Sequence, residues 1–358
     1  MNEFDIAVIA GDGIGPEVTA EELKVLEAAA DVYGFKLRFR HYPHGSEHYF
    51  KTGEIFPDAA FEEVKAQDGI LLGAIGDPRA PVGLIEYGII AKMRFELDLY
   101  VNLRPIKVFD ERLCPLKGKK AEDIDMVFIR ENTEDAYIGG HAFAHKGQPH
   151  EVATQTLVYT RAGVERAIRY AFDLARTRNK RRKVMLIDKA NAMRAHDLWT
   201  RVFADVAREY PDVETDHAYV DAACMWMIKN PEWFDVAVTT NMFGDILTDL
   251  GAVLQGGMGI AASANIHPGR KGLFEPIHGS APKYAGQNSA SPVAAIMAGS
   301  MLLDYLGLKE AGAAIERTVI DLLRSGRIKG VGNGMHRTTE VGDMIAAELR
   351  SAVASART

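Results

Sequence analysis

The feature that most constrains the fold of this 358-residue chain is the alternation of short apolar runs with longer amphipathic stretches. Ile6–Ala10 and Gly69–Ala74 have the length and aliphatic content of buried strands, and the segment from about Pro16 to Tyr33 has helical periodicity. Further runs continue the pattern, with Met126–Ile129, Val184–Ile187 and Val236–Thr239 as strands and Arg161–Arg176 and Asp197–Glu209 as helices. The alternation predicts an α/β fold with a largely parallel sheet.

Length, charge and cysteine content narrow the class of protein. A chain of 358 residues exceeds the usual size of one compact core, which predicts two domains. The formal net charge of −7 disfavours nucleic acid or an anionic membrane as a partner. Cys114 and Cys224 cannot build a disulfide framework, and Ile6–Ala10 is too short for a signal or membrane segment. We therefore expect a cytoplasmic protein, with no membrane partner.

A glycine-rich loop, Gly11–Glu17, follows the first expected strand. A dinucleotide-binding Gly-x-Gly-x-x-Gly loop needs Gly or Ala where this chain has Pro16, and an acidic residue that ends a second strand about twenty positions later. Neither requirement is met. Pro16 suits the first turn of a helix, and Glu17 suits the positive end of its dipole. The loop predicts a tight strand-to-helix turn near a ligand.

Two aspartates follow the expected strand Val236–Thr239. Asp245 and Asp249 are four residues apart, so they share one face of a helix. An isolated pair of this kind is more often a solvated acidic face, but the flanking residues here are apolar. Asp221 lies at the edge of another apolar segment. Carboxylates without Cys or His nearby suit Mg²⁺ or Mn²⁺ better than zinc.

Basic and phenolic side chains lie at the ends of other apolar runs. Arg94, Arg104 and Arg130 each suggest a structural ion pair, whereas together they would form a fork-like site for a di- or tricarboxylate. Lys189 is either a solvated strand end or a base whose pKa falls in a cationic, partly desolvated site. Tyr137 is either a proton donor or a packed core tyrosine.

Together these segments resemble the isocitrate and 3-isopropylmalate dehydrogenase family, the β-decarboxylating dehydrogenases, from Gly11 to Asp343. Several independent motifs occur in the order found in the family, which is more specific than one glycine pattern. These motifs are Gly11–Glu17, Asp98–Pro105, Arg130–Tyr137, Asp188–Asn191, Asn241–Asp249 and Glu275–Pro282.

The resemblance implies a two-domain α/β fold with a large, mostly parallel sheet flanked by helices. Residues 1–98 and 252–358 would form a discontinuous cofactor-side domain. Residues 99–251 would form the dimerisation and substrate domain, with an extended arm or hairpin near 138–160 and the active site in the cleft. The resemblance also implies a homodimer with shared active sites, in which Lys189 and Asp221 enter the site of the other subunit.

The same likeness implies catalytic roles. Asp245 and Asp249, with the partner's Asp221, would bind Mg²⁺ or Mn²⁺, which chelates the C2 hydroxyl and its carboxylate. Lys189 would act as the base, directly or through water, while hydride leaves C2 for the nicotinamide. Decarboxylation would follow, and Tyr137 would protonate the resulting enol. A non-catalytic regulatory subunit is the alternative of another class, and it would be expected to lack one of these residues.

The likeness also bears on the cofactor. The expected binding residues are Gly73, Ala74, Ile75, Gly76, Glu275, His278, Gly279, Ser280, Ala281, Lys283, Tyr284 and Asn288. NAD-using relatives carry Asp-Ile after the His-Gly-Ser-Ala-Pro run. This chain has Lys283-Tyr284, as in NADP-linked isocitrate dehydrogenases, where a cation meets the 2′-phosphate. NADP is therefore slightly favoured over NAD.

The expected substrate is a malate-type 2-hydroxy acid whose carboxylates are bound by Arg94, Arg104 and Arg130. Isocitrate dehydrogenases place Ser and Asn where this chain has Gly88 and Ile90, which disfavours isocitrate. Isopropylmalate enzymes use Glu and paired Leu in the helix that leads to the first substrate arginine. This chain has Tyr87, Ile90 and Ala91 there. Tyr87-Gly88 and Gly139–Gly147 resemble tartrate and D-malate dehydrogenases. A 3-substituted malate such as 3-isopropylmalate, and unsubstituted malate or tartrate, both remain open.

Overall fold

The computed structural model describes residues 2–356, with side chains up to residue 351. The chain divides into two compact units. Unit 1 comprises Met1–Leu99, Pro105–Ile124 and Ala252–Thr358, and unit 2 comprises Tyr100–Arg104 and Asp125–Gly251. Pro105–Ile124, which was expected with the second domain, groups with unit 1. The reason is local bonding, since Arg324 donates to the carbonyl of Phe109 at 2.9 Å and Arg112 donates to that of Leu323.

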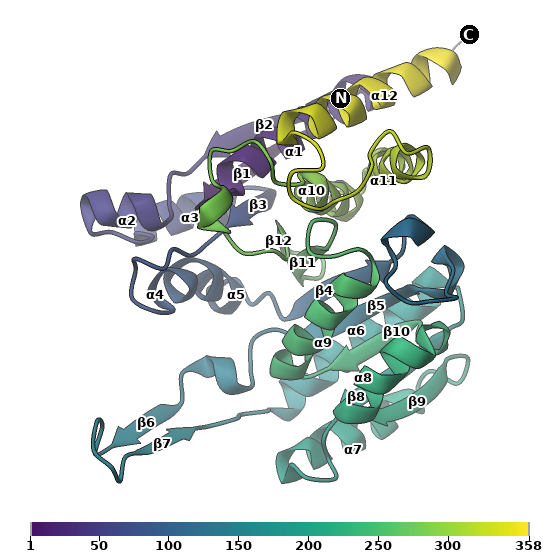
Figure 1. The fold of residues 1–358 in the computed structure, drawn as a ribbon. Coiled ribbons are helices and arrows are strands. Elements are labelled where there is room, and N and C mark those ends of the chain that lie inside the picture. Colours follow the sequence, from purple (N-terminus) through teal and green to yellow (C-terminus); the bar gives the residue numbers. More distant parts are fainter. Residues whose placement is uncertain (1, 357–358) are drawn as a thin grey trace. The chain divides into compact units, whose positions relative to one another are not determined.

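Unit 1 is built on a mixed sheet with the strand order β2-β1-β3-β12-β11 (Figure 1). Neighbouring strands are parallel, except that β11 and β12 pair antiparallel. The strands are β1 (Glu3–Gly11), β2 (Lys36–His41), β3 (Gly69–Ala74), β11 (Ala262–His267) and β12 (Lys271–Pro276). The helices are α1 (Gly15–Tyr33), α2 (Ser46–Thr52), α3 (Asp58–Ala66), α4 (Leu84–Glu86), α5 (Lys92–Glu96), α10 (Val293–Tyr305), α11 (Lys309–Arg324) and α12 (Thr338–Ala356).

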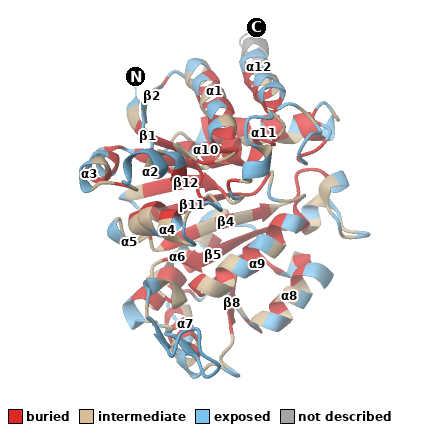
Figure 2. Cartoon of the chain, turned by 60° about the vertical axis from the view of Figure 1, so that its left-hand side comes forward, coloured by how far each residue is buried: buried red, intermediate tan, exposed pale blue. Residues whose placement is uncertain are grey.

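The core of unit 1 lies between this sheet and its helices (Figure 2). β3 is buried along its whole length, as expected of a central strand. Helix α1 packs against α10 and α12, and α10 lies on β12. Pro16 lies in the first turn of α1, and Gly34, with a φ of 73°, ends the helix. The predicted first strand and first helix are confirmed.

Unit 2 has the strand order β4-β5-β10-β8-β9, and β5, β10, β8 and β9 run parallel. The strands are β4 (Val101–Lys107, which runs across the boundary of the units), β5 (Asp125–Glu131), β8 (Lys183–Asp188), β9 (Glu214–Tyr219) and β10 (Val236–Thr239). The helices are α6 (Arg161–Arg178), α7 (Asp197–Ala207), α8 (Val220–Lys229) and α9 (Asn241–Leu254). The predicted α/β class with a mostly parallel sheet is confirmed.

The segment of unit 2 near 138–160, where an arm or hairpin was expected, contains a separate antiparallel hairpin. Its strands are β6 (His141–Ala144) and β7 (Val152–Gln155). Every residue of both strands is exposed, and the hairpin extends away from the sheet of its own unit (Figure 1). Among residues 2–356, no helix combines the length and apolar character that a membrane span requires.

Candidate active site

The parallel strands of unit 2 bring several candidate residues to one sheet edge. Thr239, at the end of β10, is in register with Arg130 of β5 and Ile187 of β8. The carboxyl ends of parallel strands form the usual ligand-binding edge of an open α/β sheet. Arg130, the start of α9 and Lys189 therefore all lie along this edge.

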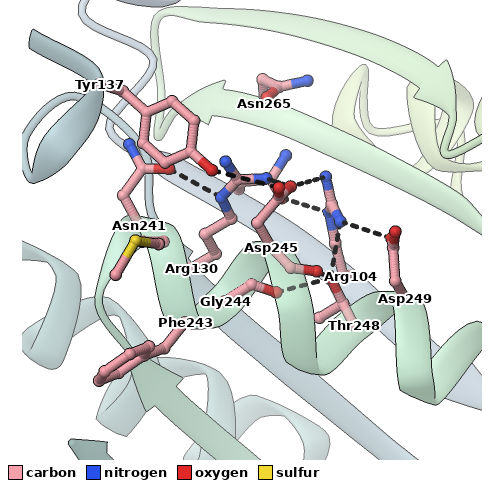
Figure 3. A network of polar contacts seen from close by, with 12 residues as sticks. Arg104, Arg130, Tyr137, Asn241, Phe243, Gly244, Asp245, Thr248, Asp249 and Asn265 are labelled. Carbon is pink, nitrogen blue, oxygen red and sulfur yellow. Dashed lines mark hydrogen bonds and ion pairs between the residues drawn. The ribbon is translucent and has the colours of Figure 1, made fainter. Parts of the chain in front are cut away.

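Helix α9 carries a compact polar cluster (Figure 3). Asp245 bonds to the guanidinium of Arg130 and accepts a hydrogen bond from the hydroxyl of Tyr137 at 3.2 Å. Arg104 reaches both aspartates, with Nη2 3.7 Å from Asp245 Oδ1 and Nη1 3.8 Å from Asp249 Oδ1. The structure thus brings together five of the predicted residues, all of them in unit 2.

Neighbouring polar groups hold the two arginines in place. Arg104 donates to Asn102 and to Thr248, both at 2.6 Å, and Arg130 donates to Asn241 at 2.8 Å. Both guanidinium groups are almost completely buried. Buried, doubly anchored guanidinium groups are rigid forks, which suits them to bind carboxylates.

Burial tunes the titration of the cluster. Burial raises the pKa of Tyr137, and the adjacent charge of Asp245 raises it further, so the hydroxyl keeps its proton at neutral pH. Burial also raises the pKa of Asp249, and the positive charge of Arg104 opposes this shift. A protonated tyrosine beside a carboxylate and two arginines is a suitable proton donor.

Lys189 and Asp221 form a second polar pair in unit 2. The Nζ of Lys189 lies 2.5 Å from Asp221 Oδ1, and the lysine side chain is 26% exposed. Lys189 was expected in a cationic site, but within one chain its contact is a carboxylate. The ion pair joins Lys189 to Asp221 rather than to the aspartates of α9.

The carboxylates of α9 fit part of a divalent metal site. Among the described residues of a single chain, no three His, Cys, Asp or Glu side chains gather where they could hold a metal ion. Asp245 and Asp249 lie one turn apart with side chains 42% and 50% exposed, so their oxygens are accessible. They fit two ligands of a hard cation that takes oxygen donors, and its further oxygen ligands would come from other groups or from water.

The other predicted substrate residues lie in unit 1. Arg94 on α5 donates to Glu275 at 3.0 Å, and Asn265 donates to the same carboxylate oxygen at 2.7 Å. Tyr87 and Ile90 belong to a π-helical turn, Tyr87–Ala91, between α4 and α5. Tyr87 is exposed, whereas Ile90 packs against the core. π-Helical turns of this kind are frequent at functional sites.

In unit 1, the glycine loop after β1 contacts the two loops that are expected to bind the cofactor. The backbone N–H of Asp12 donates to the carbonyl of Ala74 at 2.6 Å, and that of Ile14 donates to Ser280 at 2.8 Å. The carboxylate of Asp12 accepts from Gly76 N–H at 2.9 Å. A β-carbon on Gly13 would lie 1.9 Å from the Ser280 carbonyl, so only glycine fits. The glycines of the first loop permit this close backbone contact.

A cavity of about 280 Å³ lies beside these loops in unit 1. Its lining includes Ile14, His278, Ala281 and the segment 331–333. Nδ1 of His278 lies 3.0 Å from the carbonyl of Gly279, and its buried Nε2 has no hydrogen-bond partner among the described residues. Burial lowers the pKa of His278, so the ring is neutral and Nε2 is an acceptor without a donor. Such an orphaned acceptor fits a cavity that receives a ligand.

The remaining cofactor candidates have different surroundings. Lys283 is exposed and lies over the ring of Tyr284, 4.7 Å from its centroid. The side chain of Asn288 exchanges hydrogen bonds with the backbone and hydroxyl of Thr339 at the start of α12. Asn288 is therefore anchored to α12, whereas Lys283 is available to an anion.

Sequence patterns missed the residues that hold the cluster in place. Asn102, Thr248 and Asn241 anchor the arginines. Thr248 and Asn241 do so on another element, far away in the chain, whereas Asn102 lies two residues from Arg104 on β4. Thr248 follows Gly244 by one helical turn, and its hydroxyl donates to the Gly244 carbonyl at 2.7 Å. The sequence feature that could have identified Thr248 is its position between Asp245 and Asp249 on one face of the helix.

A parallel α/β unit with buried arginines, accessible carboxylates and a protonated tyrosine at its strand ends defines an enzyme that acts on a small anion. The chain matches the isocitrate/isopropylmalate dehydrogenase family over residues 5–345, and it belongs to that family. It is accordingly an oxidoreductase, a decarboxylating dehydrogenase that acts on a CH–OH group.

Individual relatives agree with this assignment. The chain is 48% identical to a 3-isopropylmalate dehydrogenase from Thermobifida fusca, with 95% of this chain and 96% of the relative covered. It is 46% identical to one from Mycobacterium avium, covering 96% and 99%. The crystal structure of an isocitrate dehydrogenase from Methylococcus capsulatus superposes with a TM-score of 0.87 at 37% identity, covering 98% and 100%.

Proposed function

We propose that this protein oxidises and decarboxylates a 3-substituted malate, 3-isopropylmalate or a close analogue, using NAD(P) and a divalent metal. The observation that carries the proposal is the α9 cluster, in which Arg104 and Arg130 lie beside Asp245, Asp249 and Tyr137. The relatives with 46–48% identity that are named 3-isopropylmalate dehydrogenase support the substrate class.

The arginines would bind the substrate carboxylates. Arg104 and Arg130 offer buried guanidinium groups that are already oriented, so little side-chain entropy is lost on binding. We assign Arg94 the same role, with Glu275 holding its guanidinium. Displacement of Asp245 from Arg130 by a substrate carboxylate would free that aspartate to bind a cation.

The chain's own residues would move the protons. The partner's Lys189 would act as a neutral amine, released from its ion pair with Asp221, and would accept the proton of the C2 hydroxyl at Nζ while the cofactor takes up the hydride. Tyr137 would then give its proton to the carbon that loses the carboxylate, and its raised pKa keeps that proton available. A divalent metal bound by Asp245 and Asp249 would supply Lewis-acid stabilisation of the developing oxyanion.

A homodimer would complete the metal site. The third carboxylate would be the partner's Asp221. Exposed apolar side chains on α8 and α9 support an interface there, since large apolar groups in open solvent are unfavourable. These side chains are Met225, Ile228, Ile246 and Val253.

The cofactor would occupy the cavity beside the glycine loop and the two loops that it contacts. The unprotonated Nε2 of His278 suits the exocyclic amine of an adenine, and Ile14 and Ala281 offer apolar contacts to its ring. The exposed ammonium of Lys283 suits a 2′-phosphate, which favours NADP slightly over NAD.

The choice among hydroxy acids follows from the π-helical turn. A β-carbon on Gly88 would lie 2.6 Å from the Cγ2 atom of Ile55, so the serine of isocitrate dehydrogenases would not fit without rearrangement. Ile90 offers no hydrogen bond to a further carboxylate. Both residues disfavour isocitrate, and Ile90 favours an alkyl substituent. Tartrate or D-malate is the second candidate, because Tyr87-Gly88 and Gly139–Gly147 resemble tartrate and D-malate dehydrogenases.

The test is cofactor reduction measured by absorbance with 3-isopropylmalate, D-malate, tartrate and isocitrate, each with NAD or NADP and with Mn²⁺ or EDTA. We expect metal-dependent turnover that is fastest with 3-isopropylmalate. Asp245→Asn should reduce kcat by about a thousandfold or more while the circular dichroism spectrum is unchanged. Full activity of this variant, or of the wild type in EDTA, would exclude the metal role.

A further inference from the structure

Asp135 in unit 2 has a backbone conformation that other residues rarely adopt. Its φ of 76° and ψ of −148° lie near a region occupied essentially by glycine. The residue is fully buried, and its N–H donates to the carbonyl of Val158 at 2.9 Å. A non-glycine residue persists in such a conformation only where its side chain makes compensating contacts.

The carboxylate of Asp135 ties together two predicted catalytic segments. Oδ1 accepts the N–H of Ala136 at 2.8 Å, at the start of the 3₁₀ turn Ala136–Ile138 that contains Tyr137. Oδ2 accepts the N–H of Met242 at 2.8 Å, in the first turn of α9. A buried carboxylate at this end of α9 is also favoured by the helix dipole.

A third contact continues toward Lys189. The hydroxyl of Tyr159 donates to Asp135 Oδ1 at 2.8 Å, and Tyr159 Oη lies 3.1 Å from His196 Nε2. On the other side of the ring, His196 Nδ1 accepts the backbone N–H of Lys189 at 3.0 Å. His196 is fully buried and packs against the ring of Phe243 on α9.

One assignment of protons is compatible with every hydrogen bond between Asp135, Tyr159, His196 and Lys189. Because Nδ1 of His196 accepts from Lys189, Nε2 carries the ring proton and donates to Tyr159. Tyr159 in turn donates to Asp135. The ionisable groups that face His196 are Asp135, Tyr159 and Asp188; burial lowers the pKa of His196 more than the two aspartates raise it, so the ring is neutral.

We infer that Asp135, Tyr159 and His196 form a relay of positioning residues. The relay fixes the backbone of Lys189, which would serve the partner's site, relative to Tyr137 and the start of α9, which would serve the site of their own chain. The relay rests on the proposed function, because only there do these three segments carry reacting groups. None of the three relay residues is assigned contact with substrate, cofactor or metal. The relay sets the backbone positions from which the reacting side chains extend.

The test uses the full-length protein and two variants. Asp135→Gly removes the carboxylate while keeping a residue that tolerates the backbone conformation. Tyr159→Phe keeps the ring and removes the hydroxyl that links Asp135 to His196. We expect each variant to lower kcat, by about tenfold for Asp135→Gly, with the substrate KM changed less than about threefold. The double variant should be no slower than Asp135→Gly, because the effects of two substitutions in one series of hydrogen bonds are not additive.

Tyr210→Phe is the matched control. Tyr210 also donates its hydroxyl to an aspartate of unit 2, Asp173, at 2.9 Å, but it bonds to no predicted catalytic segment. The Tyr210→Phe variant should therefore have the kcat of the wild type. Values of kcat within twofold of wild type for both relay variants would overturn the relay. If Asp135→Gly does not fold, Tyr159→Phe decides alone.

A second readout needs no turnover. The ¹⁵N spectrum of histidine-labelled protein should contain one ring with the Nε2–H tautomer that does not protonate between pH 6 and 8, and His196→Gln assigns that signal. An Nδ1–H tautomer would contradict the relay. Since this spectrum is recorded without substrate, it tests the relay even where the hydroxy-acid assay shows no activity, an outcome that would refute only the proposed function.

Discussion

Gly244 lies one residue before Asp245 on α9, and its missing side chain makes room for Arg130. A β-carbon there would lie 2.5 Å from Arg130 Cγ. Arg130 is 2% exposed and bonded to Asn241, so it has little freedom to move aside. The position of the Arg130 guanidinium, which we propose binds substrate, therefore depends on the absence of a side chain at Gly244.

Gly244→Ala should consequently weaken the site. Helix propensity alone would make alanine more stable than glycine by about 1 kcal/mol, whereas overpacking against Arg130 costs about 1–3 kcal/mol. We expect a lower melting temperature and a KM for the hydroxy acid raised about tenfold, measured by thermal unfolding and initial rates. An increase in stability with unchanged KM would show that Arg130 adapts and would remove this argument.

At the scale of elements, apolar runs identified β1, β3, β5, β8 and β10. They missed the mostly buried β4, β11 and β12 as well as the strands at the sheet margins. β5, β8 and β10 are apolar runs and were predicted, whereas β2 and β9 lie at the ends of the strand orders and are largely exposed. Their polar sequences lack the signal, because periodicity reports burial. The π-helical turn Tyr87–Ala91 and the conformation of Asp135 were equally invisible, since both depend on contacts distant in sequence.

The packing of α1 on α10 contains a buried acid. Glu22 is 1% exposed and lies against Gly299, and neither carboxylate oxygen has a hydrogen-bond partner among the described residues. Burial raises its pKa well above the usual value. A raised pKa means that the contribution of Glu22 to stability is fully present below its unfolded pKa and is lost as pH rises through its folded pKa.

Glu22→Leu should therefore stabilise unit 1, by about 1–3 kcal/mol, because an unsatisfied polar group is replaced by an apolar one. The gain should grow as pH rises above the pKa of an exposed glutamate, about 4.3, as measured by melting temperature against pH. Glu27→Leu, on the exposed face of the same helix, is the control and should change stability by less than about 0.5 kcal/mol. A gain that does not vary with pH would mean that the pKa of Glu22 is not raised in the folded protein.

At the scale of the whole molecule, the proposed dimer divides each active site between two chains. Asp245 and Tyr137 would come from one subunit, while Lys189 and Asp221 would come from the other. The contacts within one chain are consistent with this division, since Lys189 bonds to Asp221 and Tyr137 bonds to Asp245.

Mixing two inactive variants tests the division. Lys189→Ala and Asp245→Asn should each be inactive. Refolded together, they form mixed dimers in which one site carries both defects and the other carries none, so about a quarter of wild-type activity should return. Each variant refolded alone is the control and should remain inactive. No recovery, with mixed dimers verified by mass, would place Lys189 and Asp245 in the same chain's site.

Unit 1 also has a consequence for synthesis. Its strands β1 and β3 precede most of unit 2 in the chain, but β3 pairs with β12, and α1 packs on α10 and α12 near the other end. A ribosome adding about 5–20 residues per second needs on the order of ten seconds to translate residues 100–251. During that interval the nascent N-terminal third presents an open strand edge and an uncovered apolar helix face. The chain therefore has its greatest need for chaperones before its last hundred residues have emerged.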